Sequence, residues 1–256
     1  MIDLHCHILP GLDDGPEDLE TSLEMARVAV AEGIERVVAT PHIDLVHGVV
    51  PEQIVEGVAE VNSALRSAGI PLSIIPGAEI ALPRVGSLDD DELRALSPGR
   101  HQYLLVESPY SRATGLLEQV LFDLRIRGFH PILAHPERCP DFQQDTGRLE
   151  ALVEQGVLCS VDSGSIVGQF GKRVQRFAIE LFRGALVHNV ASDAHDPVGR
   201  PPLLRTALES AERAVPGIAA RAEWFTSSVP AAIVAGETIP HTPAPANRAR
   251  SSRHSS

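Results

Sequence analysis

The sequence predicts an α/β fold in which seven parallel strands, each followed by a helix, close into a barrel. Short apolar runs rich in β-branched residues alternate with helix-patterned segments almost to the C-terminus, an order typical of parallel sheets. A length of 256 residues suits a closed β/α barrel. No glycine-rich phosphate loop follows the first apolar run, which disfavours an open sheet of the Rossmann type.

The expected strands are short, and most of them end in histidine or a carboxylate. In chain order they are MIDLH (1–5), RVVATPH (36–42), LSIIPGAEI (72–80), YLLVES (103–108), HPILAHPE (130–137), VLCSVDS (157–163) and LVHNVASDAH (186–195). The active site of a β/α barrel lies at the carboxyl ends of its strands. The residues that end these runs are therefore the first candidates for function.

The expected helices lie between these strands and have clear start and stop signals. Pro16 begins a helix that runs to Gly33, and Pro51 begins one that runs to Gly69. Apolar residues recur at intervals of three and four in the later helices, which predicts one buried face on each. These later helices are 114–129, 146–156, 171–184 and 201–215.

The sequence predicts one folded domain followed by a short tail. Residues 1–237 hold all the expected strands and helices. Residues 238–256, TIPHTPAPANRARSSRHSS, are rich in proline, alanine, serine and arginine. Such a composition cannot bury an apolar core, so we expect this tail to be disordered and its basic end to be solvated.

Composition and charge disfavour several classes of protein. The hydrophobic content of 43% is enough for a sizeable core, and the formal net charge of −12 disfavours a nucleic-acid surface, which needs a basic stripe. The three cysteines have no short spacing, so they predict neither a disulfide framework nor a zinc knuckle. No secretion signal or membrane-spanning run stands out. We therefore expect a protein of the reducing cytoplasm that does not insert into membranes.

Histidines and carboxylates gather at the expected carboxyl ends of the strands. Residues i and i+2 of a strand share a face, so His5 and His7 project together while Cys6 points away and packs in the core. The other candidates follow later strands or lie in the first loop. They are Asp13, Asp14, His42, Glu79, Glu107, His135, Asp193 and His195.

Each of these residues also has an ordinary explanation. His42 could be a hydrogen-bonded structural histidine, Asp13 and Asp14 could shape a turn, and "SDAH" could begin a helix. Taken together, however, several carboxylates buried side by side cost several kcal/mol each unless a counter-charge is present. Few lysines and arginines lie nearby in the sequence to pair with them. Divalent cations would supply that charge.

The mixture of ligand types narrows the choice of metal. With Asp13 left aside, five histidines and four carboxylates are too many for one tetrahedral zinc ion but are enough for two or three ions. Imidazole and carboxylate ligands without a thiolate suit Mn, Fe or Zn.

Two arginines complete the candidate site. Arg138 follows the fifth strand in "AHPER", and Arg200 follows the last strand in "SDAHDPVGRPP". A guanidinium group beside a cation cluster is repelled by it, whereas it binds an anion such as phosphate well. The ordinary alternative is a surface ion pair of Arg138 with Glu137 or of Arg200 with Asp196.

The motifs "HCH", "GLDDGP", "TPH", "GAEI", "ES", "AHPER" and "SDAH…GRPP" occur in an order and spacing that resemble the polymerase-and-histidinol-phosphatase (PHP) superfamily. Within it, the chain is most similar to bacterial manganese-dependent protein-tyrosine phosphatases of capsule and exopolysaccharide operons. The resemblance covers roughly residues 1–237. It implies a distorted (β/α)7 barrel with three divalent metal ions. Mn is the expected metal, and Fe and Zn are the alternatives.

The resemblance also implies a role for each candidate. His5 and His7 would bind one ion, with Asp193 as a further ligand and Glu107 as a bridge to a second ion. Glu79 and His135 would hold the second ion, and Asp14, His42 and His195 would hold the third. Arg138 and Arg200 would bind phosphate as the catalytic arginines.

The function that the resemblance implies is hydrolysis of phosphotyrosine on protein by a metal-activated hydroxide. The partner would be a bacterial tyrosine kinase. One alternative is a phosphoesterase that acts on a small molecule such as histidinol phosphate or a nucleotide, and another is a PHP domain that binds without catalysis. The segments after His42 and Glu107 do not closely follow the family pattern, and they would frame the substrate mouth.

Overall fold

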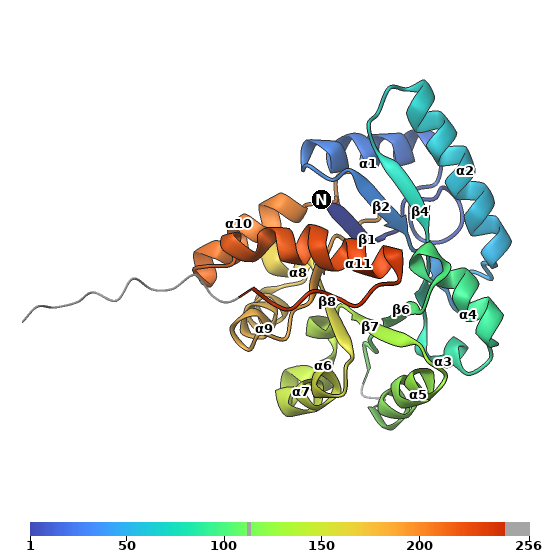
Figure 1. Cartoon of the computed structure of the whole chain (residues 1–256). Helices are drawn as coiled ribbons and strands as arrows, with labels where there is room; N and C mark the ends of the chain where they lie inside the picture. The colour runs from blue at the N-terminus through green and yellow to red at the C-terminus, as the bar shows by residue number, and fades with distance from the viewer. Residues whose placement is uncertain (112–113, 244–256) are drawn as a thin grey trace, which may run out of the picture.

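The computed structural model describes residues 1–111 and 114–243 and is an α/β barrel with its strands inside and its helices outside (Figure 1). All of its strand pairs are parallel. The strands are β1 (Ile2–Cys6), β2 (Arg36–Ala39), β3 (His42–Ile43), β4 (Ser73–Pro76), β5 (Glu79–Ile80), β6 (Tyr103–Glu107), β7 (His130–Ala134), β8 (Leu158–Asp162) and β9 (Asn189–Ala191). Each lies inside an expected range or passes its end by one residue, as β1 does at Cys6 and β3 at Ile43, so the predicted strands are confirmed.

Two of the expected strands are each interrupted in the middle. Residues 36–42 form β2 and then β3, and residues 72–80 form β4 and then β5. Strands β1, β2 and β4 pair in one sheet, while β3, β5, β6, β7, β8 and β9 pair in the other. Because β2 leads into β3 and β4 into β5, the two sheets are continuous through these strands.

The barrel closes between its first and last strands. The backbone amide of His7 donates to the carbonyl of Ala194 at 2.8 Å, and the amide of Asp193 donates to the carbonyl of His5 at 2.8 Å. A parallel bridge between Cys6 and Ala194 lies beside these bonds. The end of the second sheet is thereby joined back to β1, as the predicted barrel requires.

The expected helices are present with bounds shifted by a few residues. They are α1 (Leu19–Ala31), α2 (Pro51–Ser67), α5 (Thr114–Ile126), α7 (Thr146–Glu154), α9 (Lys172–Arg183) and α10 (Leu204–Ala214). The predicted start of the first helix at Pro16 is wrong. The side chain of Asp18 accepts a hydrogen bond from the amide of Thr21 and caps the helix there.

Several short helical segments have no counterpart in the sequence-based expectation. They are α3 (Leu82–Val85), α4 (Asp90–Leu96), α6 (Pro140–Gln144), α8 (Ser163–Val167), α11 (Val229–Ala235), the turns Pro98–Arg100, Pro136–Arg138 and Ala219–Arg221, and a π-helical segment, Trp224–Ser228. Segments of one or two turns are too short to show a helical period. Within the described ranges, every helix is too short or too polar to cross a membrane.

The residues just after position 237 contact the barrel. Ile239 packs against the apolar core, and the indole of Trp224 donates to the carbonyl of Pro240 at 3.0 Å. The hydroxyl of Tyr103 donates to the carbonyl of Glu237 at 2.8 Å. The rest of the expected tail, 244–256, lies outside the described residues.

A buried carboxylate reinforces the barrel closure. Asp3 Oδ1 accepts hydrogen bonds from the amide of Ser192 at 2.9 Å and from the amide of His5 at 3.3 Å. The side chain of Asp3 is fully buried, and burial raises its pKa to about 6. This one side chain therefore joins β1 to the segment that follows β9.

We expect Asp3→Ala to destabilise the fold by about 2–4 kcal/mol, because two buried amides lose their acceptor. Asp3→Asn is the matched control, since its amide oxygen can still accept both bonds. Urea unfolding followed by circular dichroism measures both variants. Equal stability of the alanine variant and the wild type would show that Asp3 does not hold the closure.

Candidate metal centre

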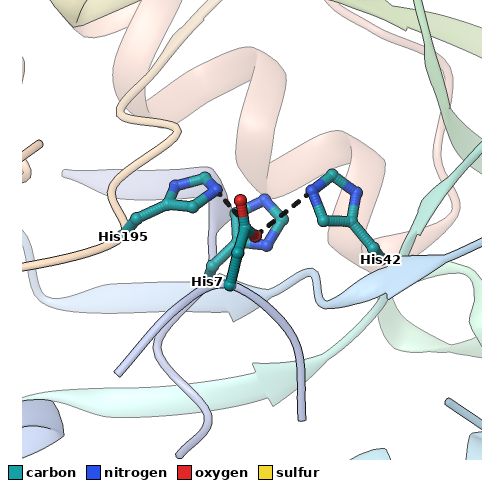
Figure 2. A group of neighbouring side chains, drawn as sticks. His7, His42 and His195 are labelled. Carbon is teal, nitrogen blue, oxygen red and sulfur yellow. Dashed lines mark ion pairs between the residues drawn. The ribbon is translucent and has the colours of Figure 1, made fainter. Parts of the chain in front are cut away.

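Three histidines from distant parts of the chain converge on one carboxylate at the carboxyl end of the barrel. His42 Nε2 lies 3.4 Å and His195 Nε2 lies 3.2 Å from Asp14 Oδ1. Figure 2 shows the rings of His42 and His195 reaching inward from opposite sides with His7 between them. The His7 and His195 rings have their centroids 3.9 Å apart.

Glu79, at the start of β5, lies at the centre of the buried part of the cluster. Its Oε2 atom is 3.3 Å from His5 Nε2, 3.5 Å from His7 Nε2 and 3.1 Å from His42 Nδ1. Its Oε1 atom is 2.9 Å from His135 Nε2. One carboxylate thus faces imidazole groups from four positions of the sequence.

Asp193 connects this cluster to the two candidate arginines. Its Oδ1 atom lies 3.3 Å from His5 Nε2 and 3.5 Å from His7 Nε2. Its Oδ2 atom accepts hydrogen bonds from Arg138 Nη1 at 2.9 Å and from Arg200 Nη2. Asp193 has a φ of 49°, in the left-handed region where non-glycine residues are uncommon and often functional.

The donor atoms form three overlapping groups in which every atom lies within 4.8 Å of the others. The groups are His7, Asp14, His42 and His195; then His5, His7 and Asp193; and then His42, Glu79 and Glu107. His135 is joined to them through Glu79. All nine residues predicted as ligands therefore lie in one continuous cluster.

Electrostatics favour positive charge at His42, between Asp14 and Glu79. Burial alone would lower the pKa of His42, but the carboxylates of Asp14 and Glu79 outweigh it and raise the pKa to about 10. The imidazoles of His195 and His42 hold the pKa of Asp14 well below its usual value. Glu107 differs, because burial and then the charge of Glu79 raise its pKa to about 7. The same carboxylates that favour a proton on imidazole would also favour a metal cation, so the two compete.

The residues present fit divalent metal ions. Among the described residues, Glu79 Oε2 and His42 Nδ1 are buried and have no hydrogen-bond partner, although they lie 3.1 Å apart. Buried polar atoms normally have a partner, and a cation between these two would satisfy both. Imidazole nitrogens with carboxylate oxygens, and no thiolate, suit Mn, Fe or Zn.

Comparison with known proteins agrees with this geometry. The family model for capsular polysaccharide synthesis proteins of the CpsB/CapC type matches residues 1–226. The chain belongs to the CpsB/CapC family.

Two curated relatives of this CpsB/CapC protein are named as phosphatases. The chain is 40% identical to the tyrosine-protein phosphatase YwqE of Bacillus subtilis over 77% of its own length and 78% of the relative. It is 29% identical to the putative tyrosine-protein phosphatase CapC of Staphylococcus aureus, over 80% and 81% of the two chains. The resemblance to capsule-operon phosphatases is therefore confirmed.

A solved structure supports the same relationship. It comes from work on YwqE of Bacillus subtilis and CpsB of Streptococcus pneumoniae, named there as unique metal-dependent tyrosine phosphatases. The match has a TM-score of 0.84 at 34% identity and covers 97% of this chain and 100% of that one.

In this CpsB/CapC chain, neither candidate arginine forms the surface ion pair that the sequence offered as an alternative. Arg138 contacts Asp162 at 3.3 Å and Asp193 at 2.9 Å, not Glu137, and the guanidinium of Arg200 contacts Asp193, not Asp196. The expectation that too few arginines are available to pair the carboxylates is therefore wrong for Asp193. Arg138 also lies over two aromatic rings, 4.1 Å from the centroid of Phe170 and 4.7 Å from that of Tyr110.

Asp13 contacts the histidines of the cluster, which the sequence around it did not predict. Its Oδ2 atom lies 2.6 Å from His7 Nδ1 and accepts a hydrogen bond from the amide of His42 at 3.0 Å, while its Oδ1 atom accepts from the amide of Gly15. A turn-forming aspartate explains only the bond to Gly15. Asp13 therefore orients the ring of His7 from outside the ligand cluster.

We expect Asp13→Asn to weaken metal binding by about 10–100-fold, the usual effect of removing a carboxylate that orients a ligating histidine. Competition with a fluorescent chelator measures the affinity for Mn²⁺ directly, without any assay of activity. Asp18→Asn, a change at an exposed helix cap that asparagine also serves, is the matched control. Wild-type affinity in Asp13→Asn would contradict the orienting role.

Proposed function

We propose that this CpsB/CapC protein is a metal-dependent phosphatase that hydrolyses phosphotyrosine on protein. The observation that carries the proposal is the buried Glu79 carboxylate, surrounded by imidazole nitrogens of His5, His7, His42 and His135 and left with one oxygen unsatisfied. The names of the relatives support the substrate class. The neighbouring arginines suit the phosphate.

In this proposal three divalent ions, Mn in preference to Fe or Zn, are held by the nine clustered residues. The proposed ligands are His5, His7, Asp14, His42, Glu79, Glu107, His135, Asp193 and His195. Bound divalent ions supply Lewis acidity that lowers the pKa of water and stabilises charge on phosphoryl oxygens.

Arg138 and Arg200 are the proposed substrate-binding groups. Both contacts of Arg138 with carboxylates use Nη1, and a guanidinium group has five N–H donors in a planar fork. Its other donors can bind phosphoryl oxygens and stabilise the charge that spreads over them in the transition state. Asp193 and Asp162 hold this guanidinium group in place before the substrate arrives.

A cysteine nucleophile has no place in this mechanism. Cys6 lies between the proposed ligands His5 and His7 and is only 1% exposed, and burial raises the pKa of its thiol. A buried neutral thiol is a poor nucleophile. The leaving phenol has a pKa of about 10, so it needs little protonation to depart.

The proposed partner is a phosphorylated bacterial tyrosine kinase, and the proposed location is the cytoplasm. Membership of a capsular polysaccharide synthesis family supports the partner class. The three cysteines Cys6, Cys139 and Cys159 are all free and buried, as suits a reducing compartment. We also propose that 1–237 form one domain and that 238–256 serve as its tail.

We expect chelation to abolish hydrolysis of a phosphotyrosine peptide while the far-ultraviolet circular dichroism stays that of a folded barrel. Adding Mn²⁺ back should restore turnover and raise Tm, because a ligand that binds only the folded state stabilises it. Turnover of histidinol phosphate is measured in parallel and should be much slower. Full activity after chelation, with elemental analysis finding no metal, would contradict the proposal.

We expect Arg138→Gln to raise KM for the phosphotyrosine peptide by about 10–100-fold, since a charge-assisted contact with the phosphoryl group is lost. The metal content, measured by elemental analysis, should stay at the wild-type level. Arg148→Gln is the matched control, because Arg148 pairs with Glu118 and Asp141 away from the cluster. An unchanged KM, or loss of metal along with activity, would argue against a substrate-binding role.

A further inference from the structure

Two short loops at the opening of the site each carry aliphatic side chains that project into solvent. The first loop follows His42 and carries Leu45 and Val46, which are 77% and 83% exposed. The second loop follows His195 and carries Val198, which is 85% exposed. We refer to Leu45, Val46 and Val198 as the rim tips.

The first loop is held in one shape by its own carboxylate. Asp44 Oδ1 accepts hydrogen bonds from the amides of Val46 and His47, both at 2.8 Å, and Asp44 Oδ2 lies 2.9 Å from His47 Nδ1. The ring of His47 stacks on the ring of His42 with a centroid distance of 5.6 Å and an interplanar angle of 13°. The loop therefore folds back onto the site and exposes its tip.

The second loop repeats this construction with a different sequence. Asp196 accepts hydrogen bonds from the amides of Val198 at 2.8 Å, of Gly199, and of Arg200 at 3.0 Å. The carbonyl of Arg200 accepts from the amide of His195 at 3.0 Å, which closes the loop. The side chain of Arg200 returns to the cluster, and the tip remains outside.

Both loops begin at the same opening. His42 and His195 contact the same oxygen of Asp14, and their ring centroids are 6.3 Å apart (Figure 2). The side chain of Asp14 is 53% exposed, so solvent reaches the cluster at this carboxylate. The rim tips lie three or four residues along the chain from His42 and His195, the two histidines that contact this exposed carboxylate.

Single exposed aliphatic residues are common on protein surfaces and need no explanation. Here, however, two turns, each held by its own aspartate, expose such residues close in sequence to the two histidines. Ordering each turn costs conformational entropy of the loop. Three side chains are too few for a stable dimer interface, which needs roughly 1,000 Å² or more of buried surface. They are enough to add contacts to a segment already anchored by its phosphate.

We propose that the rim tips bind apolar side chains next to the phosphotyrosine in an extended protein segment. This inference rests on the proposed function and adds to it a preference for the flanking sequence. The phosphate enters between His42 and His195, and the residues on either side of the phosphotyrosine bring their side chains over Leu45, Val46 and Val198. A free aryl phosphate lacks those side chains and makes no use of the tips.

The test compares the wild type with the triple variant Leu45→Ser, Val46→Ser, Val198→Ser in the Mn²⁺-loaded protein. The substrates are p-nitrophenyl phosphate and two phosphotyrosine peptides that differ only in having leucine or serine at the flanking positions. We expect the wild type to favour the leucine peptide by about tenfold in kcat/KM, a typical effect of small apolar contacts. The triple variant should lose this preference and hydrolyse p-nitrophenyl phosphate as the wild type does.

Ile126→Ser is the matched control, because Ile126 is also 73% exposed but lies at the end of α5, in a different part of the surface. It should leave both peptides and p-nitrophenyl phosphate unaffected. A second measurement uses peptides with a non-hydrolysable difluorophosphonate in place of the phosphate. Their affinities, measured by fluorescence anisotropy, should show the same preference and the same loss.

The outcomes separate the two proposals. If the wild type fails to hydrolyse any aryl phosphate, the proposed function is wrong, and the anisotropy measurement still decides whether the rim tips select apolar flanks. If the wild type binds and hydrolyses both peptides equally, or the triple variant keeps the preference, the role of the rim tips is overturned. A dimer of the wild type that the triple variant lacks, with no effect on peptides, would equally overturn it in favour of a self-association surface.

Discussion

The structure depends on the cost of placing carboxylates and imidazoles together out of water. Glu79 and Asp193 are nearly fully buried, as are His5, His7 and His135. Uncompensated charges in such a place cost several kcal/mol each, and the contacts among these groups leave buried polar atoms without partners. This donor set therefore fits divalent cations, which would give the unsatisfied atoms a partner.

The strands are shaped to bring these groups into contact. The interruptions at 40–41 and 77–78 restart each strand, so that His42 and Glu79 pair directly in the second sheet. Gly77 is required at one interruption, because a Cβ atom there would lie 2.5 Å from Val38 Cγ1. His135 and Asp193 both adopt positive φ, which turns the chain sharply after β7 and β9. At these points the regular strand geometry is interrupted, and the backbone takes the conformation that brings the side chains of the cluster together.

The sequence predicted the parts of this arrangement that follow from local pattern. Strand parity placed His5 and His7 together, and the carboxyl-end rule placed the other proposed ligands at one end of the barrel. It did not predict that Arg138 and Arg200 both reach Asp193, because such contacts depend on loop conformations that no periodicity records. The contact of Asp13 with His7 could not be predicted either. The motif "DDG" indicates only a turn, and the contact forms only once the loop is folded. The short helices such as α8 and α11 escaped prediction because one or two turns leave no pattern to detect.

Asp193 links the part of the site that favours cations to the part that favours anions. One oxygen faces His5 and His7, while the other accepts hydrogen bonds from Arg138 and Arg200. Each side therefore changes the charge that the other side experiences. A phosphate bound as proposed by the guanidinium groups would draw them away from Asp193 and would leave that carboxylate more negative toward the histidine side. A cation held as proposed by the histidines would in turn reduce the attraction of Asp193 for the arginines and would free their donors for the phosphate. Binding of cations and binding of a phosphate ester are thus expected to strengthen each other, because thermodynamic coupling between two sites is reciprocal.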